Sequence, residues 1–223
     1  MRIARGTAFF CVVAALATAG CASGAFNSER PVSQLYQISA TEPFVPPESL
    51  AATVLPVDLA VARPLPRPGL DTERIAVRYA DRRFDYYAAA RWGAEAADVV
   101  QDLLIDSMRA SGGLRTVHGH LSSFSSQYVL ETELRDFQAE YAREGDLPTV
   151  RVTLVCTVGR VRDRAALATF TSSAAVRADD NSQRAVVAAF ENAYREVGAK
   201  VVTETLAALA SAPAPQPAAA SGS

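Results

Sequence analysis

The sequence predicts a single α+β domain in which a mixed or antiparallel sheet packs against two long helices. Two observations support this fold class. Apolar and polar residues alternate with strand periodicity in several segments, and two long segments carry apolar residues at helical spacing. The segments follow the order strands, helix, strands, helix, and neither a repeat nor a separate linker divides them. The predicted domain spans residues 32–210.

The first part of the domain is expected to form short strands. Residues 35–38 are a brief strand candidate, and the proline-rich segment 41–49 is expected to be a loop. Alternation predicts strands over 53–62 and 75–79, and a shorter strand over 84–87. These segments precede the first predicted helix.

The first helix is predicted over 88–110. Trp92, Ala96, Val99 and Leu103 recur at spacings of three and four residues, which places them on one face of a helix. Gly112 and Gly113 follow where a left-handed helix end is expected. A small strand is predicted over 114–117.

The second half of the domain predicts three consecutive strands followed by a helix. In 128–141, Tyr128 and Leu134 share one parity whereas Phe137 occupies the other. Either a bulge near Asp136 shifts the register or both faces are partly covered. Strands over 150–161 and 165–176 complete an antiparallel meander. Capping residues at 179–182 then open a helix that runs to about residue 210.

The two ends of the chain are expected to lie outside the domain. Residues 1–20 form a secretory leader, because Arg2 and Arg5 precede a short apolar run and small residues. Cys21 follows directly, which resembles a bacterial lipoprotein signal, and the resemblance implies diacylation of Cys21. Ordinary cleavage with Cys21 as a free thiol is the alternative. Residues 21–31 read as a tether, and the Ala- and Pro-rich tail 211–223 is expected to be disordered.

Composition narrows the classes of function. The net charge is −2, and loss of two arginines with the leader changes it to −4, so the chain has no basic field for nucleic acid. Beyond the leader and Cys21, Cys156 is the remaining cysteine, so an intramolecular disulfide within the domain is excluded. Cys156 alternates with apolar residues of a predicted strand and is expected to be a buried hydrophobe.

The sequence favours a binding protein over an enzyme. His118 and His120 lack further metal ligands nearby, and no serine lies in a Gly-x-Ser-x-Gly pattern. No phosphate-binding loop follows the paired glycines, so no cofactor or metal is expected. A secreted hydrolase is the remaining enzymatic hypothesis, and it would depend on Ser122, Ser123 or Cys156.

One aromatic cluster is a candidate for partner contact. Tyr86, Tyr87 and Trp92 lie close together before the predicted helix, and aromatic residues are enriched at protein interfaces. Packing of Trp92 in the core against the sheet is the preferred interpretation, with partner contact as the alternative.

The lipoprotein signal, the order of strands and helices, and the Arg91-Trp92 pair together resemble the ABC-type transport auxiliary lipoprotein family, which includes the PqiC-like proteins. The resemblance covers roughly residues 31–210. It implies an outer-membrane lipoprotein, anchored at the periplasmic face, that docks to the MCE-domain periplasmic protein of an ABC system for intermembrane lipid transport, with self-assembly into a homo-oligomer as an option. Ala22 after the cysteine, in place of Asp, agrees with outer-membrane sorting. The alternative is a structural lipoprotein for envelope or outer-membrane assembly.

Overall fold

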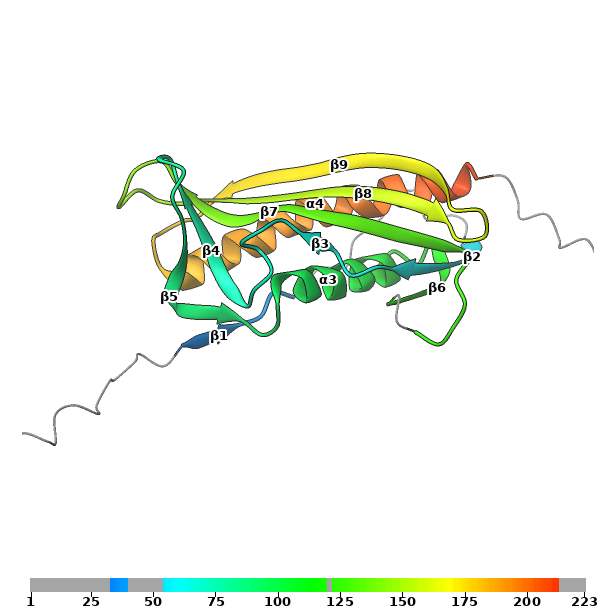
Figure 1. Cartoon of the computed structure of the whole chain (residues 1–223), viewed down its shortest axis with the longest axis horizontal. Coiled ribbons are helices and arrows are strands. Elements are labelled where there is room, and N and C mark those ends of the chain that lie inside the picture. The colour runs from blue at the N-terminus through cyan, green and yellow to red at the C-terminus, as the bar shows by residue number, and fades with distance from the viewer. Residues whose placement is uncertain (1–32, 40–53, 120–121, 213–223) are drawn as a thin grey trace, which may run out of the picture. The chain divides into compact units, whose positions relative to one another are not determined.

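A computed structural model describes residues 33–39, 54–119 and 122–212, all of which belong to one unit, Ser33–Ser223 (Figure 1). The predicted leader, Cys21, the tether, the loop 41–49 and the tail beyond residue 212 lie outside the described residues. In chain order the elements are β1 (Gln34–Tyr36), β2 (Leu55–Val61), β3 (Leu65–Pro66), β4 (Arg74–Tyr79), β5 (Phe84–Trp92), α3 (Ala96–Ala110), β6 (Leu114–Gly119), β7 (Tyr128–Tyr141), β8 (Thr149–Arg160), β9 (Ala165–Arg177) and α4 (Gln183–Ala210).

Strand β7 is the centre of the mixed sheet. Along one edge it pairs in parallel with β2, β3 and β4 in turn, from Leu59 beside Tyr128 to Ala76 beside Gln138. Pro64 and Pro68 flank β3 and Pro66 lies within it, and their missing backbone donors prevent a single continuous strand from forming there. The predicted α+β class with one mixed sheet and two helices is confirmed.

The other edge of β7 carries the predicted antiparallel meander, which is confirmed. Strand β7 pairs with β8, and β8 pairs with β9. Pairing of β7 with β8 shifts register between Leu134 and Asp136, so a bulge is present at the predicted place. Because of this shift, Leu134 and Phe137 point to the same side of the sheet, and both are at most 1% exposed.

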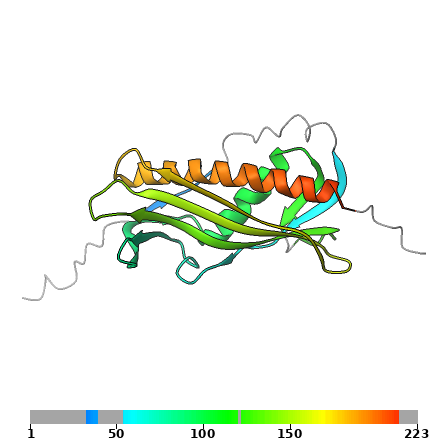
Figure 2. The ribbon, with the colours of Figure 1, turned by 90° about the horizontal axis from the view of Figure 1, so that it is seen from above.

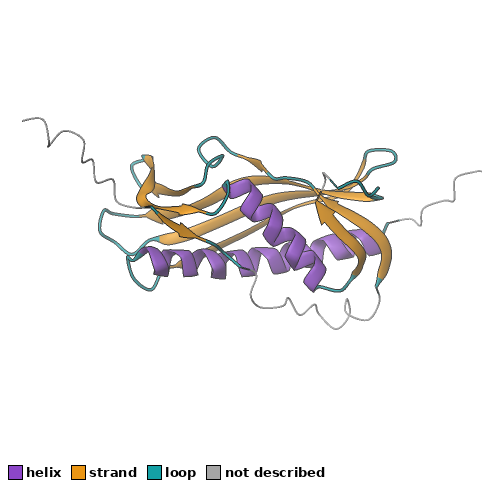
Figure 3. Cartoon of the chain, turned by 90° about the horizontal axis from the view of Figure 1, so that it is seen from below, coloured by secondary structure: helices purple, strands orange, loops and turns teal. Residues whose placement is uncertain are grey.

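Both helices lie on one face of the sheet (Figures 2 and 3). The residues that bury this face come from every major strand and from both helices. At its centre, Trp92, Phe137 and Phe190 form an aromatic cluster with ring centroids 4.9 to 5.6 Å apart. Such large buried rings contribute heavily to the hydrophobic stabilisation of a domain of this size.

The predicted start of the first helix is wrong. Residues 88–92 belong to β5, and α3 begins only at Ala96. The backbone N–H of Trp92 donates to the carbonyl of Glu73 at 2.7 Å, and that of Gly93 donates to Tyr36 at 3.1 Å. These donors are used by neighbouring strands, so the alanine-rich segment before Trp92 remains extended. Trp92 is buried like the apolar residues of α3 and fits their helical spacing, so the predicted helix began too early in the sequence.

The predicted signals at the two helix ends agree with the structure. Gly112 has φ of +62°, the left-handed conformation expected after α3. At the start of α4 the Ser182 hydroxyl accepts a hydrogen bond from the Ala185 N–H at 3.2 Å. Within the described residues, neither helix has the length and apolarity needed to cross a membrane.

Candidate interaction surface

The face of β7, β8 and β9 opposite the helices is the candidate functional site, and we call it the open face. Strand alternation places its side chains between the buried ones of the same strands. Its members are Val129, Glu131, Glu133, Asp136, Gln138 and Glu140 of β7, Arg151, Thr153, Val155 and Thr157 of β8, and Thr169, Thr171 and Ser173 of β9.

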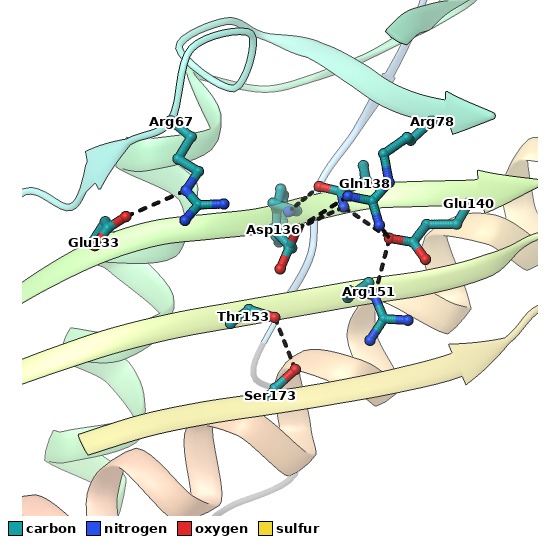
Figure 4. Close-up of polar contacts among 10 residues, drawn as sticks. Arg67, Arg78, Glu133, Asp136, Gln138, Glu140, Arg151, Thr153 and Ser173 are labelled. Atoms are coloured by element: carbon teal, nitrogen blue, oxygen red, sulfur yellow. Dashed lines mark hydrogen bonds and ion pairs between the residues drawn. The ribbon is translucent and has the colours of Figure 1, made fainter. Parts of the chain in front are cut away.

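A polar network occupies the middle of the open face and extends toward the β7–β8 turn (Figure 4). Glu140 is its hub: its carboxylate pairs with Arg78, accepts from Arg151 at 3.0 Å and accepts from the Gln138 amide at 3.0 Å. The Gln138 amide also donates to Asp136 at 3.0 Å. Since Glu140 is 18% exposed and its two arginines are about 40% exposed, the network is partly screened by water.

Hydroxyl pairs connect β8 to β9 across the same face. Thr153 and Ser173 lie 2.8 Å apart, and Thr157 and Thr169 lie 3.1 Å apart (Figure 4 shows the first pair). Cross-strand hydroxyl pairs of this kind stabilise the register of neighbouring strands. Their short side chains leave this part of the face flat. The Lys200 ammonium reaches β9 from α4 and donates to the Thr171 carbonyl at 3.0 Å.

Three shallow depressions lie along this side of the sheet. One of about 650 Å³ lies where β4 and β7 end and β8 begins, and its lining includes Arg78, Arg82 and Leu147. Two more, of about 400 and 410 Å³, lie toward the β8–β9 turn and share Glu131 and Thr157. Depressions this shallow suit contact with another macromolecule better than enclosure of a small molecule.

The aromatic residues predicted as a contact cluster do not form one patch. Trp92 is fully buried in the core, and its indole N–H has no partner among the described residues. Tyr86 donates its hydroxyl to the Gly69 carbonyl at 3.0 Å. The Tyr87 hydroxyl lies 2.8 Å from that of Tyr141, and Tyr141 itself donates elsewhere, so Tyr87 is the donor. Burial of the ring, followed by this hydrogen bond, raises the pKa of Tyr87.

Neighbouring residues on a strand point to opposite sides, so Tyr86 and Tyr87 cannot present their rings together. Partner contact through either tyrosine stays a prediction. The same holds for acylation of Cys21, which lies outside the described residues.

Among the side chains considered for catalysis or metal binding, Cys156 is buried and His118 is hydrogen-bonded, whereas His120 lies outside the described residues. Cys156 is fully buried, and burial raises the pKa of its thiol to about 11, so it is a poor nucleophile. His118 lies between the Ser126 hydroxyl at 3.0 Å and the Gly119 carbonyl at 3.1 Å, a hydrogen-bonded arrangement that sequence reasoning did not predict. Across the parts of the chain that the structure describes, no three acidic, histidine or cysteine side chains gather as a metal site.

Comparison with known families identifies the domain. The model of the ABC-type transport auxiliary lipoprotein component family matches residues 36–202. The chain belongs to this family. The matched region includes all of β7, β8 and β9, and therefore the whole open face. The predicted resemblance is thereby confirmed, and membership supports a membrane-anchored envelope protein that serves a transport system.

Solved structures extend the comparison. The crystal structure of protein XCC0632 from Xanthomonas campestris, of the DUF330 family, is 26% identical with a TM-score of 0.71, and the match covers 79% of this chain and 96% of that one. An uncharacterized protein is 11% identical with a TM-score of 0.60 over 78% of this chain and 98% of that one, which shows a shared fold. No curated protein matches the chain.

Sequence reasoning did not identify the open face as a site. Its signal was present, because charged and hydroxyl residues alternate with apolar ones through 128–134 and 150–158. That pattern indicates a half-covered sheet, but a solvated face and a binding face look alike in the sequence alone. One of the depressions is lined by Leu65, which comes beside β7 only through the tertiary pairing of β3 with β7.

Proposed function

We propose that this protein is an outer-membrane lipoprotein of an MCE/ABC-type intermembrane lipid transport system. It acts by docking its folded domain to the periplasmic MCE protein of that system while Cys21 anchors it in the membrane. The proposal assigns no catalytic step to the chain. The ATPase and permease functions belong to other chains.

The family match carries this proposal. It covers 36–202, which is nearly the whole domain, and its description names a transport auxiliary lipoprotein. The lipoprotein-like signal at Cys21 supplies the anchor that such a component needs. Helices cover one face of the anchored domain, and its open polar face is available to recognise a second protein.

The chain length between anchor and domain adds a geometric limit. Eleven residues separate Cys21 from Ser33, the first described residue, so the chain makes twelve Cα-to-Cα steps between them. A fully extended chain of that length reaches about 40 Å, so β1 must stay within that distance of the membrane surface. Docking to the far end of a periplasmic transport protein needs this proximity.

The direct test is copurification from solubilised membranes. Tagged wild-type protein should retain an MCE-domain protein through washing, whereas an unrelated tagged outer-membrane lipoprotein should not. Recovery of envelope-assembly proteins without any MCE protein would favour the structural alternative instead.

The anchor requires its own test. We expect Cys21→Ala to move the protein from the membrane fraction to the soluble periplasmic fraction, because several acyl chains provide most of the binding energy. Cys156→Ala is the matched control and should leave the distribution unchanged. Unchanged membrane association of Cys21→Ala would contradict lipidation.

A further inference from the structure

The two depressions toward the β8–β9 turn lie next to each other on the open face, and we call the pair the trough. Both are lined by Glu131 of β7 and Thr157 of β8, so they meet at these two residues. Along the strands, the floor runs through alternate residues from Val155 to Gly159, a length of about 13 Å at the rise of a β-strand. The trough therefore matches the length of an extended peptide of about four to five residues.

Apolar side chains provide anchors at both ends of the trough. Leu65 is 72% exposed at one end, and Val161 is 49% exposed at the other. Leu65 lies between two prolines, whose rings restrict its backbone. An exposed apolar residue on a restrained backbone loses little conformational freedom on binding, which is a property of a preformed contact site. Val129 and Val155 add half-buried apolar surface to the floor.

Most charged groups that line the trough already have partners. Arg63 pairs with Asp71, Glu95 and Asp98. Glu133 accepts from Arg135 at 3.1 Å, and arginine neighbours lower the pKa of its carboxyl, the hydrogen bond from Arg135 being the largest cause.

Two charged lining residues are different. Within the described residues, Glu131 and Arg164 have no ion pair or hydrogen bond from a side chain. Glu131 is exposed and lines both depressions, so an unpaired carboxylate lies where they meet. Arg164 lies at the end formed by the β8–β9 turn.

We propose that this trough binds an extended segment of a partner protein that carries a lysine or arginine flanked by apolar residues. The basic side chain pairs with Glu131, and the apolar neighbours contact Leu65 and Val161. Arg164 then faces an acceptor group of the segment. The inference deepens the proposed function and rests on it, because it assigns the docking site.

A lipid acyl chain fits the trough less well. An acyl chain over Glu131 would remove a carboxylate from water without giving it a counter-charge, which is costly. A peptide with a basic residue satisfies the carboxylate and covers the apolar anchors together.

Photo-crosslinking in intact cells tests the assignment. A p-benzoylphenylalanine at position 157 of the anchored full-length protein should form one main adduct with a chain of the transport system. The same probe at position 204, which is exposed on α4, should not. Mass spectrometry of the adduct should place the crosslink in a segment with a basic residue between apolar ones.

Charge variants decide whether the contact uses Glu131. We expect Glu131→Lys to lower the yield of the crosslinked adduct at position 157 at least about tenfold, because like charges would then face each other. Glu131→Gln should lower this yield less. Glu204→Lys makes the same charge change on α4 and should leave the yield unchanged. Reversing the basic residue of the partner should restore the adduct of Glu131→Lys.

The outcomes separate this inference from the proposed function. If an MCE protein copurifies but Glu131→Lys changes neither its recovery nor the adduct, the docking site is wrong and the function stands. If the charge-dependent adduct is with another protein of the envelope, the trough stands and the MCE assignment fails. A lipid adduct, a crosslinked second copy of this chain or no adduct at position 157 would overturn the proposed occupant.

Discussion

The two faces of the sheet differ in what holds their side chains. The helix-covered face is filled by closely packed apolar groups, with Trp92, Phe137 and Phe190 in mutual contact and almost no exposed area. The open face is held by hydrogen bonds and ion pairs such as those of Glu140, whose partners remain in contact with water. Stability is therefore concentrated on one face, and the other face is free to vary in its contacts with a partner.

This division bears on how a transport component can evolve. Changes on the covered face leave cavities that the packed interior cannot close, whereas changes on a solvated polar face cost little. A docking surface on the open face can thus be adapted to its partner without endangering the fold. Four substitutions, from the largest expected effect to the smallest, test the contrast.

Phe190→Ala should produce the largest loss. The ring is fully buried between Trp92 and Phe137, so its removal should lower the free energy of unfolding by about 3–5 kcal/mol. The free energy of unfolding is measured by urea unfolding, with the fluorescence of Trp92 as the signal. Phe124→Ala is the control, because Phe124 is 75% exposed and its loss should change stability by less than about 0.5 kcal/mol. Equal effects of the two variants would contradict the conclusion that stability is concentrated on the helix-covered face.

Ser182→Ala should have an intermediate effect on the same face. It removes the hydroxyl that accepts from the Ala185 N–H at the start of α4, and loss of such a cap costs about 1 kcal/mol. Ser182→Asp retains an acceptor and should preserve stability, whereas Ser125→Ala in an exposed loop is a neutral control. Thermal unfolding of the four proteins gives the comparison. If Ser182→Ala and Ser125→Ala unfold together, the cap contributes nothing to holding α4 on the sheet.

The features that the sequence predicted correctly are local, and those that it missed depend on contacts between distant parts of the chain. The meander, the bulge at Asp136 and the cap of α4 are encoded within a few residues, so alternation and capping rules found them. The start of α3 was wrong, because the extended state of 88–92 depends on hydrogen bonds to Glu73 and Tyr36 from other parts of the chain. The trough was missed for a related reason. It needs Leu65 beside Glu133, a parallel pairing between residues 68 positions apart that no local pattern specifies.

Asp58→Asn should expose a pH-dependent contribution on the open side of the sheet. A hydrogen bond from Arg115 is the largest cause that lowers the pKa of the Asp58 carboxyl below its ordinary value of 3.8, with Thr116 adding to it. Because the folded-state pKa is the lower one, the stabilisation is complete above the ordinary value and is lost as pH falls through the lowered pKa. The stability difference between wild type and Asp58→Asn should therefore be largest near neutral pH and shrink below pH 3.8.

Urea unfolding at several pH values measures this difference. Glu144→Gln serves as the control, because Glu144 is exposed in the β7–β8 turn and has no ion pair within the described residues. A difference for Asp58→Asn that stays constant from pH 7 to pH 3 would show that the Arg115 contact does not stabilise the fold.

Glu140→Gln should have the smallest effect on stability, although it removes the charge of the network's hub. Arg78 and Arg151 are about 40% exposed and can be hydrated when the carboxylate is lost, so the expected change is within about 0.5 kcal/mol. Gln is nearly isosteric and can still accept from Gln138. A loss of about 3 kcal/mol or more on urea unfolding, as expected when a buried ion pair loses one partner, would show that the open face supports the fold as the covered face does. A near-zero change would instead leave Glu140 available for recognition, since an ion pair that contributes little to folding can exchange its arginines for groups of a partner at little cost.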